Sequence, residues 1–269
     1  MINKINVFLI FTKNKKMLII ISPAKKSQIP QIKRKDYTKI EFPEESKILV
    51  SELRKFKPEK LSSLMNISPK LAELNYERYI NWNFPFETDN TGAALFMFNG
   101  DVYRGMQPND FTEDDVLFTQ NRLRILSGLY GIIKPLDKIM PYRLEMGTKL
   151  QTENGQNLYQ FWGDKITERL NKYLQKSENK VLINLASDEY FKAVKKLNVT
   201  GKIITPVFKE QKRENFKVIA IYAKRARGLM CRFIIKNKIT KTEDLKVFDY
   251  EKYSYNEDLS SEEEFVFTR

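Results

Sequence analysis

Tyrosine, arginine and carboxylate side chains gather in the stretch 122–147, around a short apolar run. The run, residues 123–126, is too short for a surface helix and predicts a buried strand. The glycines and prolines that follow predict a long polar loop, bent and stiff enough to aim Tyr130, Tyr142, Arg143 and Glu145. Phenol, guanidinium and carboxyl groups held in one place can bind anions or transfer protons. We therefore take this stretch as the centre of a candidate site.

The same pattern, an apolar run that breaks into small, hydroxyl or charged residues, occurs five times in the chain. The runs are residues 18–21, 94–98, 123–126, 181–185 and 218–222, and each predicts a strand. If several are parallel, their carboxyl ends line one crevice, which is where open α/β sheets bind ligands. The alternative is that strands commonly end in polar residues without further meaning. Charged residues that follow these runs include Lys25, Lys26, Asp101, Asp188, Glu189, Lys224, Arg225 and Arg227.

Acid–base chemistry in this chain would have to come from Asp, Glu, Lys or Tyr, because it has no histidine and a single cysteine, Cys231. This composition excludes a disulfide within the chain, a zinc site of cysteine and histidine ligands, and a histidine-based triad. A metal ion would have to be held by carboxylates alone, because soft and imidazole ligands are missing. We assign no metal site and no cofactor. If the protein is an enzyme, the candidate catalytic residues are Asp101, Tyr142, Glu145, Asp188 and Glu189.

Basic residues outnumber acidic ones, with 47 Lys and Arg against 34 Asp and Glu and a formal net charge of +13. This balance favours a polyanionic partner or an anionic membrane surface. The apolar run 5–11 is too short to span a membrane, and lysines rather than a cleavage signal follow it. We therefore expect neither export nor a membrane partner. A cytoplasmic location fits the lone thiol.

Residues 58–82 carry the most specific local signal. They predict two short helices joined by a tight turn, with Ser68 as the cap and Pro69 as the first residue of the second helix. The turn resembles the hairpin of the helix-hairpin-helix DNA-binding module, where hairpin amides and the second helix hold a phosphate. Two glycines of that hairpin are replaced here by Asn66 and Ser68. An ordinary helical hairpin is the alternative. The expected buried stripe of the second helix is Leu71, Leu74, Tyr76 and Ile80.

The remaining patterns predict a mixed α/β (α+β) protein: a single domain over residues 17–269, with a central mixed sheet flanked by helices and the helix-hairpin-helix element. Residues 1–16 are expected to be an extension outside the fold. Further helices are expected over 43–55, 112–122, 157–174 and 189–197, and another strand over 203–208. Residues 217–241 hold eight basic residues and no acid, which favours an anion-binding surface. The acidic C-terminal segment carries enough aromatic residues to dock on the body.

Seven ordered motifs resemble those of the YaaA family of bacterial peroxide-stress proteins, from residue 17 to the C-terminus. They are SPAK at 22–25, FNGDVY at 98–103, LSGLYG at 126–131, PYRLEMG at 141–147, LYQFWG at 158–163, NLASDEYFK at 184–192 and ARGLM at 226–230. The resemblance implies a cytosolic, single-domain α/β protein with a helix-hairpin-helix element and a positively charged cleft. It also implies binding of double-stranded DNA and a role in limiting iron-driven oxidative damage during peroxide stress. It implies no enzymatic reaction.

Two hypotheses of different classes follow. In the first, the protein binds double-stranded DNA, mainly through phosphates, and no protein partner is expected. Its DNA-binding residues would be Asn66, Ile67, Ser68 and Lys70 of the hairpin with Lys25, Lys26, Arg143, Lys224, Arg225 and Arg227. In the second, the protein is an enzyme that acts on a nucleic acid or a nucleotide through the carboxylates and tyrosines at the strand ends. A binding module does not need such groups, which keeps the second hypothesis open.

Overall fold

The computed structural model describes residues 17–30 and 33–269, so the expected extension, residues 1–16, lies outside the described residues. The strands are β1 Met17–Ile21, β2 Lys26–Ser27, β3 Gly92–Ala93, β4 Phe98–Asn99, β5 Leu123–Ser127, β6 Gly131–Ile133, β7 Lys138–Ile139, β8 Val181–Leu185, β9 Lys202–Lys212, β10 Asn215–Lys217, β11 Ser254–Tyr255 and β12 Glu264–Thr268. The helices are α1 Pro43–Arg54, α2 Pro58–Met65, α3 Pro69–Asn81, α4 Ala94–Met97, α5 Asp101–Met106, α6 Glu113–Arg122, α7 Leu158–Trp162, α8 Lys165–Leu174, α9 Asp188–Phe191 and α10 Ala220–Lys236.

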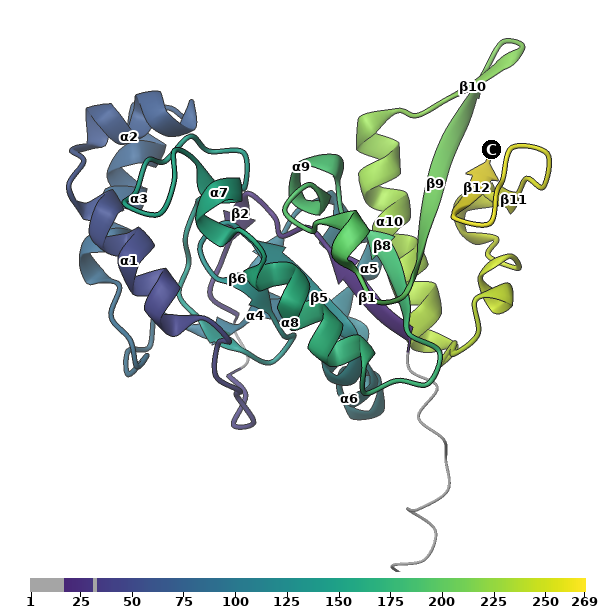
Figure 1. Ribbon diagram of the computed structural model, residues 1–269, viewed down its shortest axis with the longest axis horizontal. Helices are drawn as coiled ribbons and strands as arrows, with labels where there is room; N and C mark the ends of the chain where they lie inside the picture. The colour runs from purple at the N-terminus through teal and green to yellow at the C-terminus, as the bar shows by residue number, and fades with distance from the viewer. Residues whose placement is uncertain (1–16, 31–32) are drawn as a thin grey trace, which may run out of the picture.

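The central sheet is mixed and places the parallel strands β9, β8, β1 and β5 side by side (Figure 1). Its order is β11-β12-β9-β8-β1-β5-β6, with β10 paired to the end of β9. Strands β6, β10 and β11 run antiparallel to their neighbours. Every residue of β1 and β8 is buried, because helices cover both faces of a parallel sheet, and this explains their continuous apolar runs. The predicted α/β class with a central mixed sheet is confirmed.

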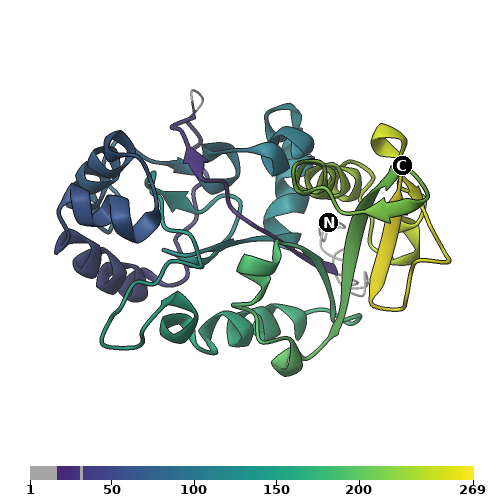
Figure 2. The ribbon, with the colours of Figure 1, turned by 90° about the horizontal axis from the view of Figure 1, so that it is seen from above.

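Helices lie on both faces of the sheet (Figure 2). α5, α6 and α10 lie on one side and α7 and α8 on the other, while α1, α2 and α3 pack beyond the β6 edge (Figures 1 and 2). At the opposite edge the C-terminal segment returns and adds β12 in parallel to β9. Its aromatic residues Phe265 and Phe267 are buried, so the expected docking of this segment is confirmed. No helix within the described residues is long and apolar enough to cross a membrane.

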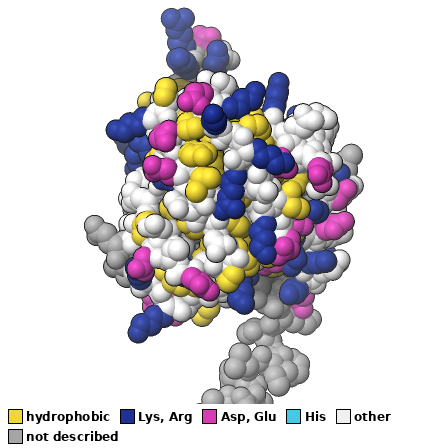
Figure 3. All heavy atoms as spheres, turned by 90° about the vertical axis from the view of Figure 1, so that its left-hand side faces the viewer, with side chains coloured by type: hydrophobic (Ala, Val, Ile, Leu, Met, Phe, Trp, Pro, Cys, Tyr) yellow, Lys and Arg dark blue, Asp and Glu magenta, His cyan; other side chains and the backbone are white. Residues whose placement is uncertain are grey.

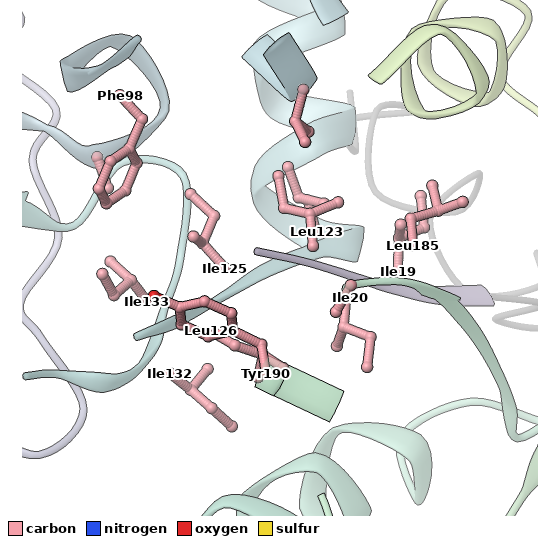
Figure 4. Packing of buried hydrophobic residues seen from close by; sticks show 14 of the residues in the cluster. Ile19, Ile20, Phe98, Leu123, Ile125, Leu126, Ile132, Ile133, Leu185 and Tyr190 are labelled. Atoms are coloured by element: carbon pink, nitrogen blue, oxygen red, sulfur yellow. The ribbon is translucent and has the colours of Figure 1, made fainter. Parts of the chain in front are cut away.

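One apolar cluster joins the central strands to the helices. Around β1 and β5 the side chains of Ile19, Ile20, Leu123, Ile125 and Leu126 pack together and are at most 1 % exposed (Figure 4). Burial of an aliphatic side chain of this size contributes about 1.5–3 kcal/mol. This layer holds the carboxyl ends of the strands in fixed relative positions, and the candidate site depends on those positions.

Two of the five expected strands are wrong. Residues 94–97 form the short helix α4, because the chain turns there after Gly92 has paired with β7. Residues 218–222 are not a strand either, since β10 ends at Lys217 and α10 begins at Ala220. A short apolar run does not by itself separate a strand from a piece of helix.

Two expected helices are divided or shortened. Residues 157–174 form α7 and α8 rather than one helix, because the chain turns at Gly163, whose φ of 49° lies in the left-handed region. After β8, helix α9 ends at Phe191 instead of continuing to residue 197. The predicted positions of α1, α2, α3 and α6 are confirmed, and Thr112 caps α6 in a capping box with Asp115.

The second helix of the hairpin, α3, buries a different face from the one expected. Ala72 and Tyr79 are buried, whereas Leu71, Leu74 and Ile80 are 38–47 % exposed. Apolar side chains therefore gather, among basic ones, on the side of the molecule formed by α1 to α3 (Figure 3). The expected stripe is wrong, and polar contacts help to set which face of α3 is buried.

Those contacts come from Tyr79 and Arg54. The Tyr79 hydroxyl donates a hydrogen bond to the carbonyl oxygen of Arg143, and the Arg54 guanidinium donates to the carbonyl oxygens of Tyr79 (2.8 Å) and Ile80 (3.1 Å). Arg54 thus satisfies carbonyl groups that the end of α3 leaves without intrahelical donors. The hairpin is in this way attached to the loop that carries Glu145.

The stretch behind β5 is buried rather than a polar loop. Tyr130 and Tyr142 are 0 % and 4 % exposed, and their rings meet edge to face with centroids 5.0 Å apart. The Tyr130 hydroxyl accepts a hydrogen bond from the Trp82 indole N–H at 3.0 Å. The stretch is part of the core, and it still delivers Glu145 to the cavity described below.

Candidate functional site

A cavity of about 310 Å³ opens where β1 and β8 end. These strands are adjacent and parallel, so Ser22 and Ser187, the residues that follow them closely, come together. The Ser187 N–H donates to Ser22 Oγ at 2.9 Å, and the two hydroxyl oxygens are 3.2 Å apart. Helices α9 and α10 both stand at this edge of the sheet (Figure 1). The charged residues that line the cavity are Lys25, Lys26, Asp101, Arg104, Glu145, Glu189, Lys224 and Arg227.

Glu145 is held between two cations. Its Oε2 lies 2.7 Å from Lys25 Nζ, and its Oε1 accepts a hydrogen bond from an Arg143 guanidinium nitrogen at 2.9 Å. The Lys25 side chain is 61 % exposed, whereas those of Glu145 and Arg143 are 21 % and 15 % exposed. Each carboxylate oxygen therefore has one cation, and the buried partner, Arg143, fixes the position of the carboxylate at the cavity wall.

The other lining carboxylates also have partners. Glu189 Oε1 accepts a hydrogen bond from the Gly147 N–H at 2.9 Å, so α9 is tied to the loop that carries Glu145. Asp101 Oδ1 lies 3.3 Å from an Arg104 nitrogen in the same helix. Such exposed pairs are weak, about 0–1 kcal/mol, but they keep three carboxylates in defined places around one cavity.

Helix α10 brings Lys224 and Arg227 to the cavity lining and packs very closely on α5. A Cβ atom at Gly228 would lie 1.9 Å from the Val102 carbonyl oxygen, and one at Gly105 would lie 2.2 Å from the Arg225 carbonyl oxygen. Only glycine permits this approach of the two backbones. Residues three apart on a helix share a face, so Lys224 and Arg227 point to the same side.

Neither Lys224 nor Arg227 has an ion-pair partner among the described residues, in contrast to most other arginines of that region. Arg227 is half-buried; burial lowers the pKa of its guanidinium, and the negative charge of Asp188 opposes that shift. A buried cation without a counterion is unfavourable. This wall of the cavity is therefore a place where a bound anion would be stabilised.

Besides the hairpin residues, four of the predicted residues lie outside the cavity lining. Arg225, two residues before Arg227, pairs with Glu251 at 2.6 Å on another side of α10. Asp188 is exposed and acts on Arg227 only through its charge. Arg143 stands behind Glu145 and supports it.

Tyr142 is the fourth and has a structural role. Its hydroxyl and Ser127 Oγ are 2.6 Å apart inside the core, and burial raises the pKa of the phenol far above its usual value. Tyr142 is therefore buried in the core and is not among the residues that line the cavity.

The predicted hairpin residues lie at the α2–α3 turn, away from the cavity lining. Asn66 adopts the left-handed conformation (φ 49°), and Ser68 caps α3 by accepting a hydrogen bond from the Leu71 N–H at 3.4 Å. The N–H groups of Asn66 and Ile67 both bond to the Ser62 carbonyl oxygen. Lys70 is exposed.

Sequence reasoning did not nominate several residues that complete the cavity. Ser22 and Ser187 were visible as strand-end residues but carry no charge, and Tyr103 and Tyr190 occur inside helical segments. The Tyr103 hydroxyl donates to the Ser22 carbonyl oxygen at 3.4 Å, which ties α5 to the end of β1. The signal that could have found them is the small or hydroxyl residue directly behind each buried strand.

This arrangement can bind an anion at Lys224 and Arg227. The carboxylates of Asp101, Glu145 and Glu189 can accept hydrogen bonds from N–H or O–H donors of a ligand. Within the described ranges no group of three or more His, Cys, Asp or Glu residues could hold a metal ion. Cys231 is buried, and burial raises the pKa of its thiol to about 12, so it is inert toward oxidants that need a thiolate.

Comparison with known proteins gives the family. The model of a family described as peroxide stress protein YaaA matches residues 17–259. A UPF0246 protein of Saccharophagus degradans is 49 % identical over 257 residues, which cover 94 % of this chain and 99 % of the relative. A UPF0246 protein of Colwellia psychrerythraea is 48 % identical over 254 residues, with the same coverage of both chains. The match includes every residue of the cavity, and the chain belongs to the YaaA family of peroxide stress proteins.

Proposed function

We propose that the protein is a cytoplasmic DNA-binding protein of the peroxide stress response, which binds double-stranded DNA mainly through phosphates and thereby limits iron-driven damage. The observation that carries this proposal is that Lys224 and Arg227, which have no ion-pair partner among the described residues, line a cavity that Lys25 and Lys26 also line. The formal charge of +13 adds a long-range attraction for a polyanion.

The hairpin supports a second phosphate contact. Because the amides of Asn66 and Ile67 are engaged by Ser62, a phosphate would meet the N–H groups of Ser68 and Lys70, for which the described part of the chain offers no acceptor. These groups lie at the start of a 13-residue helix, where the helix dipole favours an anion. The Lys70 ammonium is exposed beside them. These contacts involve backbone and phosphate, so binding would be insensitive to base sequence.

Phosphate binding would also account for the protection from iron. DNA carries a condensed layer of cations, and a protein that neutralises phosphates with Lys and Arg releases them. Ferrous ions held in that layer would be released in the same way. Peroxide would then react with iron farther from the sugars and bases, without the protein having to bind iron itself.

A salt titration tests the proposal. A fluorescent duplex is titrated with the wild type, Lys70→Glu and Lys224→Gln at several salt concentrations. Each variant should bind more weakly for every duplex sequence and lower the slope of log affinity against log salt by about 1. Lys172→Glu, an exposed lysine of α8 outside both regions, is the matched control. Wild-type affinity in both variants, with a flat salt slope, would refute binding through these residues.

Damage is then measured directly. Supercoiled plasmid is exposed to ferrous iron and peroxide with each protein present. Nicking should fall with the wild type and Lys172→Glu and rise again with Lys70→Glu. Equal protection by all three would separate protection from DNA binding and contradict the proposed mechanism.

A second candidate function, an enzyme acting on a nucleic acid or nucleotide, is favoured by one observation. Glu145 is held by Lys25 and Arg143 at the lining of the cavity, which a simple phosphate-binding surface does not require. Mass spectrometry of duplexes and nucleotides incubated with the wild type and Glu145→Gln tests it. A product formed by the wild type and lost in the variant would establish this function.

A further inference from the structure

The charged residues that line the cavity form two sets, cations of α10 and carboxylates of other elements, and together they restrict what can bind there. Lys224 and Arg227 on α10 have no ion-pair partner in the described ranges, whereas the carboxylates of Asp101, Glu145 and Glu189 lie among the other lining residues. A ligand that is anionic over its whole surface would leave the free acceptor positions of these carboxylates without hydrogen-bond donors. A ligand with one anionic group and a neutral remainder can contact both sets of residues.

The anionic group has a defined place. Lys224 and Arg227 lie three residues apart on one face of α10, and the close packing of α10 on α5 holds that face against the cavity. The Arg227 guanidinium is half-buried and presents a planar set of donors. A phosphate monoester, with several charged oxygens, would satisfy both side chains at once.

The neutral remainder must offer hydrogen-bond donors. A carboxylate accepts at about four positions, and Glu145 uses one per oxygen for Lys25 and Arg143. The free positions suit ribose hydroxyls or the amino groups of a base. The lining also includes Pro23 and Ala24, whose apolar atoms a flat ring can contact.

The size of the cavity excludes larger ligands. A volume of about 310 Å³ is near the lower end of the range for small-molecule sites. A duplex, which is many times larger, can touch the mouth but cannot enter. Inorganic phosphate would fill only the α10 end and leave the carboxylates without donors.

We infer that the cavity is a mononucleotide site, with the phosphate on Lys224 and Arg227 and the donors of the sugar or base on the carboxylates. This rests on the proposed function only in assigning Lys224 and Arg227 to phosphate. Two sources supply a phosphate together with a base: a free nucleoside 5′-monophosphate, or a single nucleotide that has left the base stack of DNA, whose phosphate is a diester and whose donors are those of the base.

Calorimetric titration tests the inference. AMP, GMP, CMP and UMP are titrated into the full-length protein, followed by the matching nucleosides and inorganic phosphate. At least one monophosphate should bind about tenfold or more tightly than both its nucleoside and phosphate, because only it engages both sets of residues. Competition by a duplex with one extrahelical nucleotide, against a fully paired duplex of the same length, then distinguishes the two sources. Displacement by the first duplex alone assigns the nucleotide to DNA, and no displacement by either assigns it to a free metabolite.

Variants locate the binding. Arg227→Gln and Lys224→Gln should each weaken monophosphate binding about tenfold or more and leave nucleoside binding unchanged. Lys224 is exposed, so its variant remains informative if Arg227→Gln fails to fold, as checked by its melting temperature. Lys172→Gln on α8, an equal change of charge outside the cavity, should bind like the wild type.

Three results would overturn the inference: no monophosphate or extrahelical nucleotide binds, phosphate alone binds as tightly as the monophosphates, or a folded Lys224→Gln binds unchanged. The proposed function fails separately. If fully paired duplex does not bind but monophosphates do, the cavity site stands and DNA binding falls. If duplex binds and monophosphates do not, DNA binding stands and the mononucleotide site is refuted.

Discussion

Replacing Glu145 by glutamine removes the negative charge that pairs with two cations, Lys25 in the cavity lining and Arg143 behind it. In the wild type, Glu145 holds Lys25 at 2.7 Å and Arg143 at 2.9 Å. Glutamine has nearly the same shape and keeps one acceptor, so the loop should stay in place. The cost to stability should be about 1 kcal/mol or less, since Lys25 is mostly exposed and solvent screens that pair. The variant therefore tests charge rather than folding.

The gain in DNA affinity can be worked out from the freed cations. Each cation that newly contacts a phosphate steepens the slope of log affinity against log salt by about 0.9. Between 50 and 200 mM salt, a fourfold change, one freed cation therefore adds about a three- to fourfold difference in affinity. We expect Glu145→Gln to bind duplex more tightly than the wild type at 50 mM and nearly equally at 200 mM.

Fluorescence anisotropy with one labelled duplex at four salt concentrations measures both the affinity and the slope of log affinity against log salt. The matched control is Glu243→Gln, which frees Lys246 from a 2.6 Å pair outside the cavity and changes the net charge equally. Its slope should equal that of the wild type. Weaker binding by a folded Glu145→Gln would refute the reasoning, because it would mean that the carboxylate positions Lys25 and Arg143 for the ligand rather than competing with it.

Deletion of residues 2–16 should leave the melting temperature within about 2 °C of the wild type, as the family match begins at residue 17; a large fall would show that the segment packs on the fold. Gly228→Ala should destabilise by about 1–3 kcal/mol in urea unfolding, because its Cβ would meet the Val102 carbonyl oxygen at 1.9 Å, and a stabilised variant would contradict this packing. Burial raises the pKa of Asp137 from 3.8 to about 6, so the folded state keeps this proton to higher pH than the unfolded chain. The free energy of unfolding should therefore lose a contribution as pH rises from about 4 to 6. Asp137→Asn should remove that loss, and identical pH profiles of unfolding for the two proteins would count against it.

Local sequence patterns were sufficient to predict several strands and the helical hairpin. The strands β1, β5 and β8 read as short apolar runs followed by polar residues, and the hairpin α2–α3 reads as two helices separated by a cap and a proline. These signals are local because they depend on backbone dihedral preferences and on burial of a whole run. The predicted class of fold followed from them.

Local patterns failed where tertiary contacts set which side of a segment is buried. Leu71 and Leu74 have the spacing of a core stripe, yet α3 turns Ala72 and Tyr79 inward because Tyr79 bonds to Arg143 and Arg54 holds the end of the helix. A polar anchor of this kind is contributed by distant residues and leaves no trace in the periodicity of the helix itself.

The sequence by itself determined the charge of the protein, the absence of histidine chemistry and the positions in the chain where charged residues follow buried strands. Only the tertiary structure decided which of those residues meet. Lys25, Glu145 and Arg227 come from distant parts of the chain and line one cavity because β1 and β8 pair in parallel and α10 packs on α5 through glycine. Arg225 and Arg227 show the reason most clearly. They lie two residues apart, but successive helical residues point about 100° apart, so one pairs with Glu251 while the other faces the cavity without a partner among the described residues.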